Sequence, residues 1–298
     1  MIKICARLNI PETSLYTKVI TKNDKPLGTR SVALLIPGGP GGNHSVYNSI
    51  QKELLVLFDI ILFDPRGCGL STPSNAEFCT IDHFIDDIEA VRQHFDLDKV
   101  ILMGGSYGAM AAVGYAIKHG GHLEKLILLA GAPSYKFLET AKLNLEKKGT
   151  PEQLKMAEHL WNGTFKDAEH FKEYYKVMAP MYLFKQPEIK QTPPTTKPNI
   201  PYNVSVTNLG FGGFLRKFDF TPYLQTIQCE TLILSGQNDW INDPCYAILM
   251  ADKIPHSTLV ILENCGHFIW EDQPELFFES LSKFIYKDSS HAKIRCKL

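Results

Sequence analysis

Short apolar runs alternate with amphipathic stretches through most of this sequence, and the alternation restricts the fold more than any other feature. Within residues 81–94, apolar side chains recur at helical intervals. The apolar runs are predicted strands, and they occupy residues 2–10, 14–20, 31–36, 57–63, 100–103, 126–130, 231–235 and 258–262. Such alternation predicts an α/β fold, with a mostly parallel sheet and flanking helices on both faces.

The strand signal stops near residue 133 and resumes at residues 231–235. Between them, residues 134–219 carry amphipathic helices, many aromatic side chains and a proline-rich loop. The simplest organisation is a core of residues 1–133 and 220–286 with residues 134–219 inserted as a helical cap. The polar, basic residues 287–298 are expected to form a flexible tail.

Composition excludes several classes of protein. The 298 residues are 44% hydrophobic, which is enough for a sizeable core. With 31 basic and 32 acidic residues, the net charge of −1 argues against a nucleic-acid partner. No apolar run is long enough to span a membrane, and seven scattered cysteines suit reduced thiols in the cytoplasm. Neither C-x-x-C nor H-E-x-x-H occurs, so neither a metal nor a cofactor is expected.

The segment Gly104-Gly105-Ser106-Tyr107-Gly108 lies between a predicted strand and a predicted helix. This G-x-S-x-G pattern in strand–turn–helix context is typical of a nucleophile elbow, which holds a serine on a sharp turn. Glycines leave room for the close approach of helix and strand. Ser106 is therefore the candidate nucleophile.

A serine hydroxyl needs a base, and elbow folds supply the partners in the chain order Ser, acid, His. Asp239 follows the predicted strand at residues 231–235, and His267 follows the next one. Both side chains therefore belong at the sheet edge that carries Ser106, and the three residues form a candidate catalytic triad. The competing acid Asp243 is better explained as a helix N-cap before Pro244.

The oxyanion that forms during attack needs two N–H donors. One is expected from Tyr107 and the other from Gly39, in the loop Gly38-Gly39-Pro40-Gly41-Gly42, where Pro40 has no N–H. His44 follows this loop and is a candidate for lining the substrate pocket. Asp64 also ends a strand, and we expect it to form an ion pair with Arg66.

Together these motifs resemble those of the proline iminopeptidases, which are serine peptidases of the α/β-hydrolase fold. The resemblance rests on Pro37-Gly38-Gly39-Pro40-Gly41-Gly42, Asp64-Pro65-Arg66-Gly67-Cys68-Gly69-Leu70-Ser71, the elbow, and the Asp239 and His267 motifs. It covers about residues 25–135 and 225–286. It implies an α/β-hydrolase fold and removal of N-terminal proline from short peptides.

Some positions depart from the family's pattern. Pro37 stands where the family usually has His, and Pro65 where it has Gln. The family binds the substrate's ammonium with carboxylates from the cap and from near the catalytic acid, but here Trp240 follows Asp239. Trp240 is expected to contact substrate. Candidates for a cap carboxylate are Glu173, as first choice, and Glu169, Glu188 and Asp219.

The leading hypothesis is thus an aminopeptidase that releases proline or another small residue from short peptides through an acyl-enzyme. An esterase, or another hydrolase of small apolar esters or amides, needs only the triad, the oxyanion donors and an apolar pocket. A non-catalytic ligand-binding protein on the same fold is the third alternative. The sequence leaves the oligomeric state open.

Overall fold

The computed structural model describes residues 2–22, 26–185, 200, 202–286 and, as backbone only, 295–297. The strands are β1 (Ile2–Ile10), β2 (Thr13–Thr21), β3 (Val32–Ile36), β4 (Asp59–Phe63), β5 (Val100–Gly105), β6 (Leu123–Leu129), β7 (Glu230–Gly236), β8 (Ser257–Leu262) and β9 (Arg295–Lys297). In the part described they form one nine-stranded sheet in the order β1-β2-β4-β3-β5-β6-β7-β8-β9. Pairing is antiparallel from β1 to β2 and from β2 to β4, and parallel elsewhere. The expected α/β hydrolase fold is confirmed.

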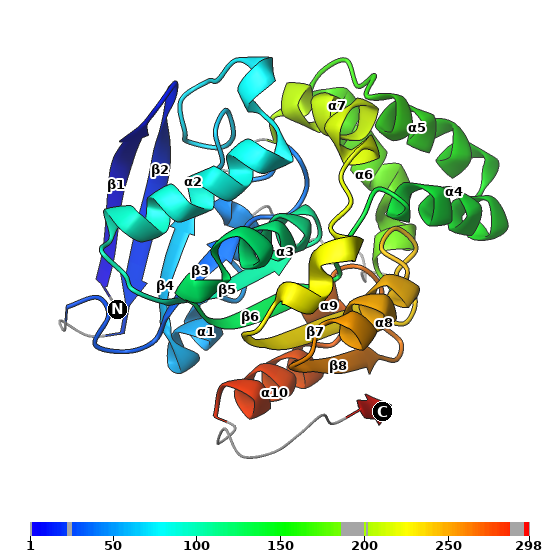
Figure 1. Ribbon diagram of the computed structural model, residues 1–298. Helices are drawn as coiled ribbons and strands as arrows, with labels where there is room; N and C mark the ends of the chain where they lie inside the picture. The colour runs from blue at the N-terminus through cyan, green and yellow to red at the C-terminus, as the bar shows by residue number, and fades with distance from the viewer. Residues whose placement is uncertain (1, 23–25, 186–199, 201, 287–294, 298) are drawn as a thin grey trace.

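Helices cover both faces of this sheet (Figure 1). The α-helices are α1 (Gln51–Leu57), α2 (Ile81–His94), α3 (Tyr107–His119), α4 (Phe137–Lys148), α5 (Pro151–Asn162), α6 (Ala168–Tyr182), α7 (Val204–Gly212), α8 (Pro244–Lys253), α9 (Ile269–Asp272) and α10 (Pro274–Ile285). Short 3-10 helices are η1 (His44–Tyr47), η2 (Ala76–Phe78), η3 (Gly120–His122), η4 (Phe214–Arg216) and η5 (Thr221–Thr226). Between β3 and β4 the chain forms η1 followed by α1.

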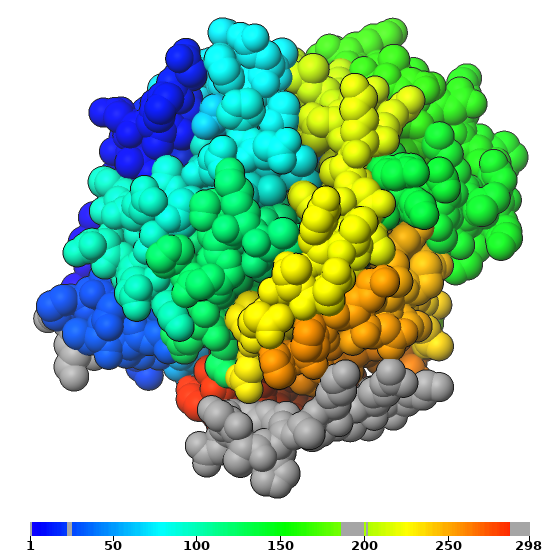
Figure 2. Space-filling view, in the orientation of Figure 1, coloured from blue at the N-terminus to red at the C-terminus, as the bar shows by residue number. Residues whose placement is uncertain are grey.

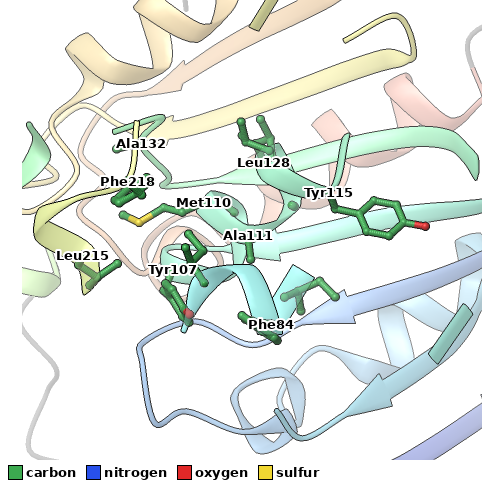
Figure 3. Close-up of a cluster of buried hydrophobic side chains, with 14 of the residues drawn as sticks. Phe84, Tyr107, Met110, Ala111, Tyr115, Leu128, Ala132, Leu215 and Phe218 are labelled. Atoms are coloured by element: carbon green, nitrogen blue, oxygen red, sulfur yellow. The ribbon is translucent and has the colours of Figure 1, made fainter. Parts of the chain in front are cut away.

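The central strands are apolar throughout because both of their faces are covered. In β3, Leu34 belongs to the core cluster that contains residues of α2, α3 and α8, whereas Leu35 belongs to the cluster with α1, α9 and α10. In β5, Leu102 and Met103 divide in the same way. Successive side chains of a strand point to opposite faces, so each strand must be apolar at every position. Figure 3 shows part of the first cluster, where Tyr107 and Phe84 stack 5.3 Å apart.

Helices α4 to α7 are inserted between β6 and β7 and lie over one end of the sheet (Figure 1). An isolated antiparallel bridge joins Ser134 to Asp219, so the chain leaves and re-enters the core at neighbouring points. Local signals fix the helix ends. A capping box between Thr150 and Gln153 begins α5, and Gly163 in a left-handed conformation ends it.

The cap and the C-terminal strand each lie against the core. In the space-filling view, the yellow-green α7 region of the cap adjoins the cyan loop that follows β4 (Figure 2). At the C-terminus, β9 pairs in parallel with β8 along residues 295–297. That segment is therefore an edge strand, where a flexible tail was expected. The proline-rich stretch and Glu188 lie outside the described residues, apart from Ile200.

Candidate active site

Ser106 occupies the turn between β5 and α3 with φ 55° and ψ −119°. A positive φ is unusual for a residue with a side chain and marks a backbone held by its surroundings. The Ser106 N–H donates to the Leu129 carbonyl oxygen at 2.8 Å. A Cβ on Gly104 would lie 2.3 Å from the Gly108 oxygen, and one on Gly108 would lie 2.4 Å from the Ile36 oxygen. Only glycine fits at both positions, so the glycines of the elbow motif are needed because α3 packs against the backbone of β5 and of β3.

Asp239 and His267 follow β7 and β8, at the same sheet edge as Ser106. His267 Nδ1 lies 2.7 Å from Asp239 Oδ2, and both side chains are buried. The other carboxylate oxygen, Oδ1, accepts the N–H groups of Ile241 and Asn242, each at 3.0 Å. The carboxylate is therefore held from one side and holds the imidazole from the other, which leaves Nε2 as the free ring nitrogen of His267.

Ser106 and His267 line one cavity of about 90 Å³. Its walls are mostly rings, and the cap supplies Phe171, Tyr174, Tyr175, Tyr182, Tyr202 and Phe211. The core adds Tyr47, Phe268 and Trp270. A ring-lined space beside a serine and a histidine suits a small apolar group.

The glycine-rich loop after β3 forms another wall of this cavity. Gly39 lines it with φ +65°, and its carbonyl accepts the Gly42 N–H at 2.9 Å. Tyr107 is the first residue of α3, so its N–H belongs to the helix end that has no partner within the helix. The Tyr107 side chain itself packs away into the core (Figure 3). Gly39 thus lines the cavity that also contains Ser106, and Tyr107 directly follows Ser106 at the start of α3.

The cap holds this loop in place. The Asn203 N–H donates to the Gly41 oxygen at 2.9 Å, and Thr207 Oγ1 donates to the Pro40 oxygen at 2.7 Å. Asn203 Nδ2 also donates to the Gly67 oxygen at 2.6 Å. These contacts come from the start of α7, a segment to which sequence reasoning assigned no role.

His44 lies beside the loop but does not line the cavity, so the expectation that it does so is wrong. Its Nδ1 lies 2.7 Å from Asp64 Oδ1, which also accepts the His44 N–H. Asp64 Oδ2 accepts the Leu70 N–H. The predicted pair of Asp64 with Arg66 is also wrong, because Arg66 binds Asp87 of α2 through two nitrogens. His44 and Asp64 instead tie the loop after β3 to the loop after β4.

Trp240 and Glu173 also lie away from the cavity, contrary to expectation. The Trp240 ring is buried against Trp161 at 5.9 Å and Tyr182 at 5.5 Å, and it borders a separate surface hollow. Glu173 is exposed and lies 3.7 Å from Lys176. The inward face of α6 carries Phe171, Tyr174 and Met178, so the helical period turns residue 173 outward. Glu169 and Asp219 are exposed as well.

A group of contacts around Asp272 was not found from sequence. This buried carboxylate accepts three backbone N–H groups, those of Gly266 at 2.7 Å, Phe184 at 2.9 Å and Lys185 at 3.0 Å. The His267 N–H donates to the Tyr182 oxygen at 2.8 Å. The turn that carries His267 is thus fastened to the end of α6. A single acid after the last predicted strand carries no sequence signal for such distant partners.

Comparison with known proteins agrees with this architecture. The sequence profile of the α/β hydrolase fold matches residues 33–274. A proline iminopeptidase of Thermoplasma volcanium is 30% identical, over 92% of this chain and 94% of the relative. The proline iminopeptidase PfmaB of Pestalotiopsis fici is 28% identical, over 94% and 99%.

Solved structures show the same fold. The proline iminopeptidase of Mycobacterium smegmatis superimposes with a TM-score of 0.72 at 19% identity, over 95% of this chain and 97% of the other. VinJ gives a TM-score of 0.75 at 20% identity, over 95% and 98%. The chain belongs to the α/β hydrolase fold family and, within it, to the group of the proline iminopeptidases. These relationships support a hydrolase. Among the described residues, no helix is both long and apolar enough to cross a membrane.

Proposed function

We propose that this protein is a serine hydrolase in which Ser106, His267 and Asp239 form the catalytic triad. Ser106 Oγ attacks the substrate carbonyl carbon while His267 Nε2 takes the hydroxyl proton. The bond to the leaving group then breaks as His267 returns that proton to the leaving nitrogen or oxygen. Water repeats the sequence on the acyl-enzyme and releases the acid. Asp239 keeps the imidazole in the tautomer that this transfer needs.

The observation that carries this proposal is the 2.7 Å contact between His267 Nδ1 and Asp239 Oδ2 beside an elbow serine in the same cavity wall. The N–H groups of Gly39 and Tyr107 are the proposed donors to the oxyanion. This acyl transfer needs no cofactor, because nucleophile, base and donors all come from the chain.

The proposed reaction is release of a small N-terminal residue, with proline first, from short peptides. The relatives named proline iminopeptidase support it, and a ring-lined cavity of about 90 Å³ suits a five-membered ring. A second candidate is hydrolysis of small apolar esters or amides. The apolar lining of the cavity favours this alternative.

A panel of substrates tests both candidates. Prolyl, alanyl and leucyl naphthylamides are compared with short-chain nitrophenyl esters, and Ser106→Ala serves as the control for contaminating hydrolases. Turnover of prolyl naphthylamide that is lost in Ser106→Ala supports the aminopeptidase. Cleavage of esters alone selects the second candidate, and binding without any turnover would refute both.

A further inference from the structure

The described lining of the cavity beside Ser106 contains no Asp, Glu, Lys or Arg side chain. Its polar side chains are His267, Trp270 and the hydroxyls of Ser106, Thr207 and several tyrosines. Burial raises the pKa of the four tyrosines that the cap contributes, which are Tyr174, Tyr175, Tyr182 and Tyr202. These hydroxyls therefore stay protonated and uncharged at any ordinary assay pH.

The buried carboxylates of the described residues are already engaged. They are Asp59, Asp64, Asp87, Glu89, Asp239 and Asp272. Three of them pair with arginines, at Arg30, Arg66 and Arg92. The other three accept backbone N–H groups or hold a histidine. None of these carboxylates lines the cavity, so an ammonium group there would have no carboxylate in the described lining to pair with, and burying an unpaired charge is costly.

The tyrosine hydroxyls can serve a neutral ligand. The hydroxyl oxygens of Tyr174 and Tyr182 lie 2.7 Å apart, so one proton is used between them and the other remains available. Tyr175 and Tyr202 also interact through their side-chain hydroxyls. Such a wall can donate to and accept from an uncharged polar group, but it cannot neutralise a cation.

We propose that this cavity binds the acyl part of the substrate in an uncharged form, as a small carbocycle, a branched aliphatic chain or an amine that has lost its proton. This inference rests on the proposed acyl transfer by Ser106. The cavity of about 90 Å³ is smaller than the roughly 150 Å³ cavity that holds benzene, so the acyl group is limited to about a five-membered ring.

Two substrates of matched shape test the charge preference. Prolyl naphthylamide and cyclopentanecarbonyl naphthylamide present the same ring with and without the amine. At neutral pH, we expect the kcat/KM of the carbocycle to lie no more than about 100-fold below that of the prolyl compound. The reason is that apolar pockets separate isosteres weakly. A larger prolyl preference overturns the proposal, since a site built to pair the amine rejects the analogue by roughly 10⁴-fold.

Binding to Ser106→Ala gives a readout that is independent of turnover. Cyclopentanecarboxamide should bind at least as tightly as prolinamide at neutral pH, and tighter binding of prolinamide by more than about 100-fold overturns the proposal. If Glu188, outside the described residues, supplies a carboxylate, the wild type prefers the amine strongly and Glu188→Gln removes that preference. That outcome also overturns the proposal.

A designed carboxylate should reverse the selectivity. Leu160 lines the cavity from α5 and is buried. Relative to the matched control Leu160→Gln, Leu160→Glu should raise the ratio of prolyl to carbocyclic kcat/KM by about tenfold or more, because close buried charge pairs couple at least this strongly. An unchanged ratio in folded variants contradicts the proposal. Where neither variant folds, the wild-type substrate pair decides.

Failure of the proposed function is distinguishable from failure of this inference. If the naphthylamides are inert but nitrophenyl esters are cleaved, the aminopeptidase reaction fails, and the ester pair of cyclopentanecarboxylic acid and proline decides the inference. If no acyl compound is cleaved, the hydrolase itself fails, and the carboxamide pair still decides which form of the ring binds.

Discussion

Replacing Asp272 by Asn should slow hydrolysis although residue 272 does not line the cavity. Its carboxylate accepts three N–H groups, and two of them, from Gly266 and Phe184, reach the same oxygen. Asparagine keeps the shape but turns one oxygen into an NH₂ donor. One backbone N–H then faces another donor, which costs about 1–3 kcal/mol, and the bonds that remain lose their charge. The summed loss is about 2–4 kcal/mol.

Part of this loss should fall on catalysis because Gly266 directly precedes His267. If about 1.4–2.7 kcal/mol of it displaces the productive imidazole position, kcat falls by about tenfold to 100-fold. The assay is kcat per active site, counted by titration with a phosphonylating reagent, well below the temperature of unfolding. Titration removes unfolded protein from the comparison, so a purely structural role would leave this number unchanged.

Glu271→Gln is the matched control, because Glu271 lies in the same short helix, is exposed, and its carboxylate accepts a hydrogen bond from Ser49 at 3.4 Å. It should leave kcat within about twofold and the unfolding temperature within about 2 °C, as surface changes do. The reasoning is refuted if Asp272→Asn matches this control in kcat per titrated site.

Further predictions follow from the site. Ser106→Ala should lower kcat by at least about 10³-fold without loss of folding, as judged by circular dichroism, and substantial residual activity would remove Ser106 from its role. Hydrolysis should decline in acid because His267 must be neutral to accept the serine proton, and a rate that stays flat through the acid range would exclude it as base. Gly108→Ala should destabilise the fold by about 3 kcal/mol in chemical denaturation, whereas Gly120→Ala, whose added Cβ meets no atom within 4 Å, should not. Burial raises the pKa of Cys265 to about 12, so this thiol should stay unmodified by iodoacetamide at pH 8, as mass spectrometry can check.

The sequence predicts the fold well wherever a residue type can occupy its position for only one physical reason. Continuous apolar runs mark strands covered on both faces, and the observed β3, β4 and β5 differ from the predictions by only one or two residues at their ends. Gly104 and Gly108 predict the elbow correctly because only glycine permits the close approach of α3 to its neighbours. Ser134 and Asp219, which bound the predicted insertion, form an isolated antiparallel bridge.

Partner choice among polar side chains is what the sequence could not give. Arg66 is two residues from Asp64 yet binds Asp87, because that carboxylate faces it from α2. His44 is of a residue type that often lines pockets, but its imidazole is paired with Asp64. Glu173, the first choice for a cap carboxylate, faces solvent because of the orientation of α6. Each error concerns which groups meet in space, and sequence separation carries little information about that.

The same limit applies to residues 134–219, which the sequence predicts as a helical cap without indicating what the cap does for the active site. The structure makes it a structural support of that site. Asn203 and Thr207 of the cap fasten the loop that carries Gly39, while Tyr182 and the segment bound by Asp272 fasten the turn that carries His267. The proposed oxyanion donor and the proposed base are therefore each positioned from the segment that also walls the acyl cavity. A change in cap packing should thus alter kcat together with KM, whereas a cap that only covered the site would alter KM alone.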